Sequence, residues 1–349
     1  MAPESSERCG YRLEIGLPGQ DFPTEPCSRP AWEDYDRCVW HAPVDGKTAG
    51  ELTAEGEPGD DLDGAYLKEA SLVGVDWLAG TSLVGADLTD ADVNGVDFSD
   101  ADLTLATLTS VSAINADFTG ANLEGAIFTN ADIRRATLVD ARLNEAVFTD
   151  VHIDDGTVLG QESVYDGGSV RPKLSDDPPL AAAAWTYREF QQIYKENALP
   201  GAARDNYNRE KDARRRLAWS QADYAPAIKW ELSRWVMNYG SSPYRVLLVS
   251  LVVIVISAVL FPLTGGIQEV QGDRAITYTV DDPQAVPTWW LGQVLLKSFY
   301  FSVITFATLG YGDIQPIGTS ARMLAGIETI LGSLLSALLV FVLARSVTW

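Results

Sequence analysis

Histidine, cysteine and lysine are scarce in this chain, and basic residues of any kind are scarce in its first part. Its 349 residues include 2 histidines, 3 cysteines and 7 lysines. Residues 1–160 hold 9 Lys and Arg against 31 Asp and Glu, a net charge of −22, whereas residues 161–349 hold 17 of each class. Such an acidic part argues against nucleic acid or anionic lipid as its partner. The shortage of Lys and the excess of Asp lead to the hypothesis of a salt-loving (halophile) host, although a repeat described below accounts for part of the Asp.

No apolar run opens the chain, so we expect no signal peptide and an N-terminal part that stays in the cytoplasm. Two apolar runs come late: residues 246–263, 18 residues without a charge, and residues 323–344, 22 residues interrupted only by Glu328. Each is near the length of about 20 residues that spans a bilayer. Two spans put both termini on one side, which the positive-inside rule identifies as the cytoplasm. The basic residues that indicate it are Lys229, Arg234, Arg245 and Arg345.

A short glycine-containing motif lies between the two runs. It consists of Thr308, Leu309, Gly310, Tyr311, Gly312 and Asp313. The two glycines permit backbone angles closed to other residues, so successive carbonyls can point at one axis, and the Thr308 hydroxyl adds another oxygen. Four such strands would replace the water shell of K⁺. A Gly-rich hairpin turn is the alternative, which the two flanking runs and the preceding aromatic helical stretch disfavour.

The residues around this motif carry a family resemblance. The stretch Tyr300 to Ala307, the motif itself, and Pro316, Arg322 and Gly332 resemble the pore module of tetrameric two-transmembrane potassium channels, over roughly residues 244–349. The resemblance implies an all-α pore with a re-entrant pore helix, a homotetramer, and passive K⁺ conduction across the plasma membrane. It does not imply an enzyme. Two alternatives stay open: a weakly selective cation channel, and a membrane-anchored binding scaffold with a vestigial pore.

The resemblance also implies roles for residues near the filter. Tyr300 and Phe301 occupy the aromatic pair that braces the filter, Thr305 supports it, and Asp313 matches the acid at its mouth. The pore helix is expected over residues 291–307, with the negative end of its dipole towards the ion. Where some members carry an acid in this helix, the chain has Ile304. Glu328 is therefore a candidate for support from behind, more as a structural hydrogen bond than as a gating group.

Gly332 matches the inner-helix hinge of the family. Helical spacing predicts that the residues after it on the same face line the cavity and inner gate: Ser336, Leu339, Val340 and Leu343. Close helix packing is the other role for Gly332. The chain ends at Trp349, and neither span carries a series of arginines, so we expect neither a C-terminal domain that pulls the inner helix nor the usual voltage sensor. Regulation is expected from the N-terminal part.

An apolar residue recurs at every fifth position from Ala65 to about Val158, with a small residue two places before it. This period fits neither helix nor strand, but it fits a square solenoid, and the pattern resembles the pentapeptide-repeat right-handed β-helix of about five coils. The frame shifts by one residue between Trp77 and Leu83, and Ala113 predicts a thin place in the core. Four acids lie two places after a centre and should point outward: Asp90, Asp100, Asp140 and Asp150. They would either be the solvated surface of a scaffold or form a cation-binding surface.

The three cysteines lie within the first 38 residues, and a histidine follows at Cys-x-x-His spacing. Three thiolates and an imidazole complete a closed tetrahedral zinc site. The predicted ligands are Cys9, Cys27, Cys38 and His41. A disulfide with a leftover thiol, or no metal at all, are the alternatives.

Residues 180–198 and 202–217 predict an antiparallel helical hairpin that acts as a coupler, and residues 224–239 predict a helix lying on the inner leaflet. Its basic and tryptophan residues would contact anionic lipid, with an ordinary packed helix as the alternative. The residues assigned to lipid are Arg214, Arg215, Arg216, Lys229, Trp230, Arg234, Trp235 and Arg245. We therefore expect a multidomain membrane protein with six segments: a cap (1–58), a β-helix (59–160), a linker (161–179), a hairpin (180–222), an interfacial helix (223–242) and a pore (243–349).

Overall fold

The computed structural model describes residues 8–13, 26–32, 34–54, 56–57, 59–160, 162–271, 274–279 and 287–347. It divides into two compact units, Met1–Ala227 and Ile228–Trp349, and each is described by itself.

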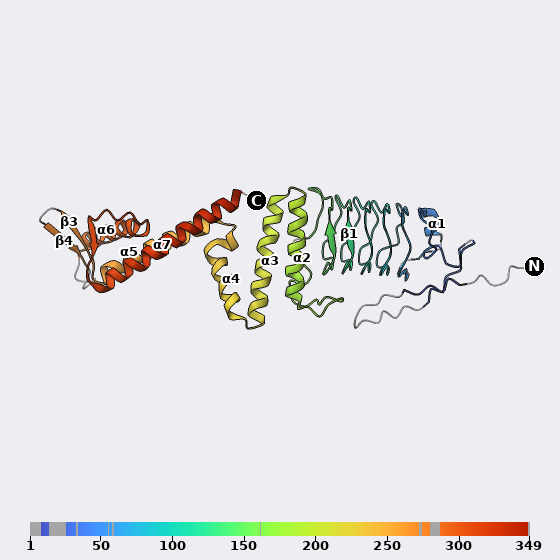
Figure 1. Ribbon diagram of the computed structural model, residues 1–349, viewed down its shortest axis with the longest axis horizontal. Helices are drawn as coiled ribbons and strands as arrows, with labels where there is room; N and C mark the ends of the chain where they lie inside the picture. Colours follow the sequence, from blue (N-terminus) through green and yellow to red (C-terminus); the bar gives the residue numbers. More distant parts are fainter. Residues whose placement is uncertain are drawn as a thin grey trace, which may run out of the picture. The chain divides into compact units, whose positions relative to one another are not determined.

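Stacked coils with an apolar centre form most of the first unit (Figure 1). Parallel bridges join each coil to the next: the partner of Asp61 is Ser82, and the partner of Ser82 is Asp102. The first coil is thus one residue longer than the second, which agrees with an inserted residue but not with its predicted place. Leu78 is fully buried, and Gly80, two places later, has φ 67°, so Leu78 takes the centre position in place of Trp77. The insertion lies between Leu72 and Leu78. The only two strands in the described coils, β1 (Ile127–Thr129) and β2 (Val147–Thr149), pair in parallel.

The predicted centres of the five-residue repeat from Leu62 to Ile153 are all buried, and phenylalanine rings of neighbouring coils stack on one another. The rings of Phe98 and Phe118 lie 5.3 Å apart, and those of Phe128 and Phe148 lie 5.0 Å apart. Ala113 is also fully buried. The core therefore grows by repetition, because each coil buries its own apolar side chains against those of its neighbours.

The residue two places after every centre from Leu83 to Phe148 has a positive φ, which explains why Asp, Asn and Gly recur there. Asp90 has φ 58°, Asp100 has φ 55° and Gly120 has φ 70°. Asp and Asn tolerate this left-handed conformation and glycine adopts it without cost. The outward acids are thus the turn residues of the scaffold, and their exposure follows from the turn.

Both ends of the coil stack are covered. The buried side chains of Trp40 and Leu52, the latter from α1 (Ala49–Thr53), join the core at its first end. At the other end, α2 (Pro179–Glu196) adds Phe190 and Ile193 to the same core. The side chain of Asn197 then accepts from Ile153 N at 3.1 Å and donates to Val151 O at 2.7 Å. Covered ends keep the open edges of a solenoid from pairing with other chains.

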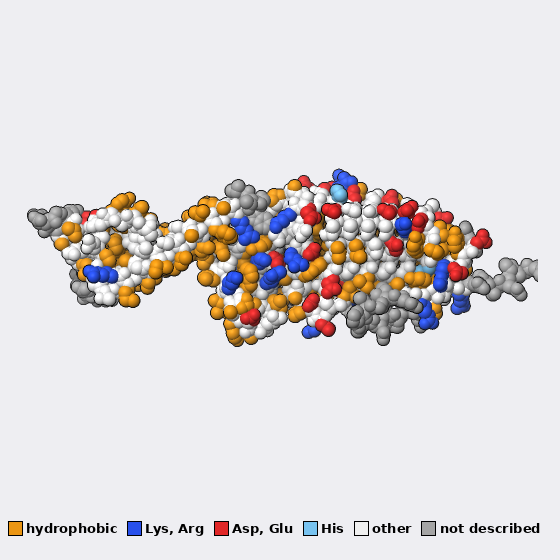
Figure 2. All heavy atoms as spheres, viewed as in Figure 1, with side chains coloured by type: hydrophobic (Ala, Val, Ile, Leu, Met, Phe, Trp, Pro, Cys, Tyr) orange, Lys and Arg blue, Asp and Glu red, His pale blue; other side chains and the backbone are white. Residues whose placement is uncertain are grey.

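α2 packs against α3 (Pro200–Ser220). The break between them is Asn197 to Leu199, earlier than the sequence predicts, because Pro200 occupies the first turn of α3, where its missing N–H costs nothing. On the face shown in Figure 2, Lys and Arg side chains gather over this helical end, and Asp and Glu are spread over the coils.

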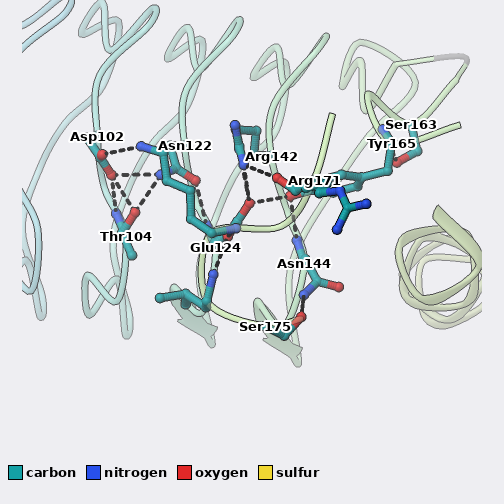
Figure 3. A network of polar contacts seen from close by, with 12 residues as sticks. Asp102, Thr104, Asn122, Glu124, Arg142, Asn144, Ser163, Tyr165, Arg171 and Ser175 are labelled. Atoms are coloured by element: carbon teal, nitrogen blue, oxygen red, sulfur yellow. Dashed lines mark hydrogen bonds and ion pairs between the residues drawn. The ribbon is translucent and has the colours of Figure 1, made fainter. Parts of the chain in front are cut away.

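The segment predicted as a linker, residues 161–179, packs along the coils over part of its length, around the fully buried Glu124 (Figure 3). The carboxylate of Glu124 accepts from Tyr165 Oη at 2.7 Å, from Arg142 Nε at 3.0 Å and from the backbone N of Leu174 at 3.0 Å. Burial, and then the nearby carboxylate, raise the pKa of Tyr165. Glu124 occupies an outward position of the repeat, but residues 163–175 cover it. The hydrogen bonds from this segment and from Arg142 give its buried carboxylate the partners that it needs.

Replacing Glu124 with alanine is expected to lower the free energy of unfolding of the coil unit by about 3–5 kcal/mol, because Tyr165, Arg142 and two backbone N–H groups lose their acceptor. Amide hydrogen exchange of full-length protein measures it: residues 163–175 should lose protection first. The control is Glu162→Ala, an exposed acid beside the same segment. Equal protection in both variants would contradict the role assigned to Glu124.

The second unit contains the two long apolar helices. α4 (Tyr224–Met237) begins in the first unit, and a single 3₁₀ turn, η1 (Asn238–Gly240), leads to α5 (Pro243–Leu263). Strands β3 (Ile267–Gln271) and β4 (Arg274–Tyr278), α6 (Thr288–Phe306), β5 (Ile314–Pro316) and α7 (Gly318–Val347) follow. α5 and residues 318–345 of α7 are long and apolar enough to cross a membrane. Hydrophobic side chains cover much of their surface in Figure 2, as lipid-facing helices require.

Candidate ion pathway and metal centre

The filter motif follows directly after α6, which contacts both α5 and α7. Three of its residues have positive φ: Thr308 at 56°, Gly310 at 53° and Gly312 at 79°. At the end of α6, Leu309 N donates to Ile304 O at 2.8 Å and Thr308 N donates to Thr305 O at 3.1 Å. The helix end thus fixes the start of the motif, while Leu309 and Tyr311 keep exposed side chains.

Asp313, the last residue of the motif, is held from two sides. Its carboxylate Oδ2 accepts from Tyr300 Oη at 2.9 Å, and its backbone carbonyl accepts from Val270 N of β3 at 3.1 Å. Phe301, beside Tyr300, is buried and packs edge-on against Phe261 of α5 with ring centroids 4.8 Å apart. Tyr300 therefore connects α6 to the filter motif, and Phe301 connects α6 to α5.

Glu328 of α7 lies against α6 and is 1% exposed. Its carboxyl group is hydrogen bonded to the hydroxyl of Ser302, which also lies 2.8 Å from Ile254 O. This buried group therefore ties α7 to α6 and, through Ser302, to α5. The bond to Asp313 comes from Tyr300 instead, so Glu328 acts on the helix and not on the filter directly.

Gly332 lets α7 pass close to the end of α6. A Cβ atom there would lie 2.1 Å from Phe306 O. Leu339 packs on the same side, against the cluster formed by Val246, Phe306, Leu335 and Val342. The structure thus gives Gly332 the close-packing role. The other predicted cavity residues are exposed in the single chain: Ser336, Val340 and Leu343.

The residues predicted to contact lipid fall into two groups. In α3, Arg214 pairs with Glu210 at 2.8 Å, Arg215 with Asp212 at 3.1 Å, and Arg216 with Asp166 and Asp212. These pairs favour the ordinary packed helix.

In α4, Trp235 is 68% exposed and Lys229 lies 5.6 Å from the ring of Trp230. At its end, Arg245 Nη1 donates to Arg234 O at 2.9 Å, which satisfies a terminal carbonyl of the helix. The exposed apolar side chains of this helix share one stripe at helical spacing: Tyr224, Ile228, Leu232 and Trp235.

The four predicted metal ligands come together at the first end of the coils. One ligand atom from each of Cys9, Cys27, Cys38 and His41 lies within 4.8 Å of the others. The sulfurs of Cys27 and Cys38 are 3.8 Å apart, and His41 Nδ1 lies 3.4 Å from Cys9 Sγ and 3.2 Å from Cys38 Sγ. Metal–sulfur bonds of about 2.3 Å at tetrahedral angles place two sulfurs about 3.8 Å apart. The group therefore can hold a metal ion such as zinc.

The surroundings of His41 fix its orientation. Its other ring nitrogen, Nε2, lies 3.1 Å from Asp63 O in the first coil, and Tyr11 stacks on the ring at 4.2 Å. A ligating histidine usually donates its second N–H to a carbonyl in this way, which leaves Nδ1 free for the metal. The hydrogen bond with Cys38 lowers the pKa of the Cys27 thiol, and a thiolate is the form that binds metal.

Two family models match the chain, one within each compact unit. Residues 249–348 match the family described as ion channel, and residues 78–109 and 114–150 match pentapeptide repeats in 8 copies. Along the sequence, the chain carries a pentapeptide-repeat domain followed by an ion channel domain. Neither family consists of enzymes, and with its two long apolar helices this is a membrane protein. No curated protein matches the chain.

Among solved structures, the chain is similar to pentapeptide repeat proteins. One is Rfr23 from the cyanobacterium Cyanothece 51142, with 21% identity over 33% of this chain and 86% of that one and a TM-score of 0.25. Another comes from the thylakoid lumen of Arabidopsis thaliana, with 29% identity over 29% of this chain and 67% of that one and a TM-score of 0.17.

Sequence reasoning missed part of what holds the ion channel domain together. The contact of β3 with Asp313 is one example. Another is the partner of Glu328, since a hydrogen bond was predicted for Glu328 but Ser302 was not named. A weak signal for the first exists in the Gly265-Gly266 doublet, which is typical of a tight turn before a strand. The bond to Ser302 had no signal, because it joins two helices 26 positions apart in the chain.

Proposed function

We propose that the protein is a homotetrameric K⁺-selective channel of the plasma membrane, with both termini in the cytoplasm. The observation that carries this is the segment from Thr308 to Gly312: it follows the C-terminal end of α6 and has positive φ at both glycines, as carbonyls that turn towards one axis require. Four copies around an axis would supply the oxygens that replace the water shell of K⁺, and the exposed filter side of the single chain agrees with a missing set of neighbours.

We further propose that α4 lies on the inner leaflet. Its exposed apolar stripe ends near the start of α5, so a spanning α5 brings this helix to the membrane surface. Lys229 can then reach lipid phosphates, whereas Arg234 pairs with Glu231 at 3.5 Å. Arg214, Arg215 and Arg216 are left out of the proposal because they already have acidic partners.

The Cys9, Cys27, Cys38 and His41 group is proposed to hold one structural zinc ion. A bound ion supplies four bonds that join residues 9, 27, 38 and 41 into one cap. The rest of the cap is held by the chain itself. Lys47 is 2% exposed and donates from Nζ to the carbonyl of Ala42 at 2.7 Å and to that of Tyr66 in the coils, and burial lowers its pKa to about 8.

The pentapeptide-repeat domain is proposed to gate or assemble the channel from the cytoplasm. Deletion of residues 1–175 separates the two roles when tetramer formation and single-channel open probability are recorded together. Tetramers with an altered open probability support gating. Loss of tetramers supports assembly, and no change in either contradicts both.

Reversal potentials of the purified channel in opposing K⁺ and Na⁺ gradients test the selectivity. We expect values near the K⁺ equilibrium potential for the wild type. Gly310→Ala should abolish K⁺ current, because alanine is strained at φ 53° and the carbonyl turns away. The control is Gly292→Ala, a position in α6 where a Cβ atom meets nothing within 4 Å. A reversal potential midway between the two ions would support a weakly selective cation channel, and an absence of current from assembled protein would support a binding scaffold.

A further inference from the structure

The chain between the two long helices forms a three-stranded antiparallel sheet with the residues that follow the filter. The strand order is β4-β3-β5, so the central strand β3 pairs with both its hairpin partner and the strand that leaves the filter. Ile267 is opposite Pro316 and Glu269 is opposite Ile314. The bond from Val270 N to Asp313 O extends this pairing into the filter motif itself.

Two glycines allow this close approach. Gly265 has φ 119°, and a Cβ atom there would lie 2.8 Å from Ile317 O. Gly266 has φ 87°, and its Cβ atom would lie 2.6 Å from Tyr278 O. In addition, Ile317 N donates to Gly266 O at 3.0 Å. The doublet thus sets the hairpin directly against the chain that leaves the filter.

An ion pair between a buried carboxylate and a half-buried lysine fixes the hairpin to the pore helix. Glu269 of β3 is 7% exposed, and its carboxylate accepts from Lys297 Nζ of α6 at 2.8 Å and from Tyr278 Oη at 2.9 Å. Tyr278 in turn stacks on Trp290 of α6, with ring centroids 5.6 Å apart. A buried carboxylate is costly unless it is paired and hydrogen bonded, so this arrangement is well defined only while Lys297 is in place.

We propose that the hairpin is a positioning element of the filter: Glu269 and Lys297 fix β3 against α6, and β3 holds the outer end of the filter at Asp313. Ion-binding groups must keep their places to within about 0.5 Å, and the outer filter has only Tyr300 and β3 among the described residues to hold Asp313. The inference rests on the proposed function, because it takes Thr308 to Asp313 as the filter. It makes the outer loop part of the selectivity machinery.

The test compares wild-type channels with Glu269→Ala, Lys297→Met and the exchange variant Glu269→Lys/Lys297→Glu. Each single change is expected to lower the K⁺/Na⁺ permeability ratio by about tenfold, which corresponds to about 1.4 kcal/mol, and to speed the decline of current at low external K⁺. The exchange variant should recover part of both. Val270→Thr is the control, since it alters an exposed side chain of β3 and keeps the backbone bond.

The inference would be overturned by single variants that form tetramers and keep both the wild-type K⁺/Na⁺ permeability ratio and the wild-type rate of current decline at low external K⁺. The inference is also wrong when the single and exchange variants all fail to form tetramers while Val270→Thr forms them, because the pair then serves folding alone. A wild type without K⁺ preference counts against the proposed function instead. In that case amide exchange over residues 314–316 still tests the contact, and it should be faster in Glu269→Ala than in Val270→Thr.

Discussion

A channel with Gly332→Ala is expected to lose at least about nine tenths of its K⁺ current, because a single methyl group would displace the end of the pore helix. The added Cβ atom would lie 2.1 Å from Phe306 O, where normal contact requires about 3.4 Å, so α6 or α7 must move by about 1 Å. Overpacking of this kind costs about 1–3 kcal/mol where neighbours can yield. Here the neighbour is backbone directly before the filter, and the filter motif moves with it.

Gly326→Ala is the matched control, since it lies in the same helix and its Cβ atom would meet nothing within 4 Å. Alanine favours a helix over glycine by about 1 kcal/mol, so this variant should conduct normally. The comparison also separates the two roles weighed for Gly332. A hinge alone lowers the open probability and leaves the K⁺/Na⁺ permeability ratio unchanged, whereas packing against Phe306 changes both. Normal current and selectivity in Gly332→Ala would contradict the close contact.

Patterns local in sequence predicted their part of the fold well. The five-residue period predicts the buried centres from Leu62 to Ile153 except one, because Leu78 takes the place predicted for Trp77. The inserted residue appears as the longer first coil. Both long helices appear where apolar runs of sufficient length predict them. Each of these features depends on a period or a run within one segment, and a single sequence records such patterns directly.

Contacts between distant segments were not predictable in the same way. The packing of residues 163–175 on the coils depends on Glu124, which has the same sequence context as any outward acid of the repeat. Likewise, the pairing of β3 with β5 joins segments on either side of α6. The metal group is the exception, because Cys and His are so scarce in this chain that their types alone selected the four ligands.

Zinc removal is expected to loosen the segments around the metal group from the first coil, and this is the largest effect on stability predicted for the first unit. Structural zinc in small domains contributes about 10–16 kcal/mol of apparent binding free energy, so the segments that carry Cys9, Cys27, Cys38 and His41 should lose their arrangement without it. Metal analysis of the purified protein should give close to one zinc per chain. After chelation, amide exchange around Asp63 should rise, because His41 Nε2 no longer bonds its carbonyl.

His41→Asn and His152→Asn form the matched pair for this prediction, since the chain has 2 histidines and the second is exposed on the coils. His41→Asn should lower zinc content and expose the first coil to proteolysis, while His152→Asn should change neither. Reversal potentials should be equal in both variants, because the metal group and the filter belong to different units. Two outcomes would contradict the site: a zinc content well below one per chain in wild-type protein, or equal zinc contents in the two variants. A shifted reversal potential in one variant would indicate instead that the cap acts on the pore itself.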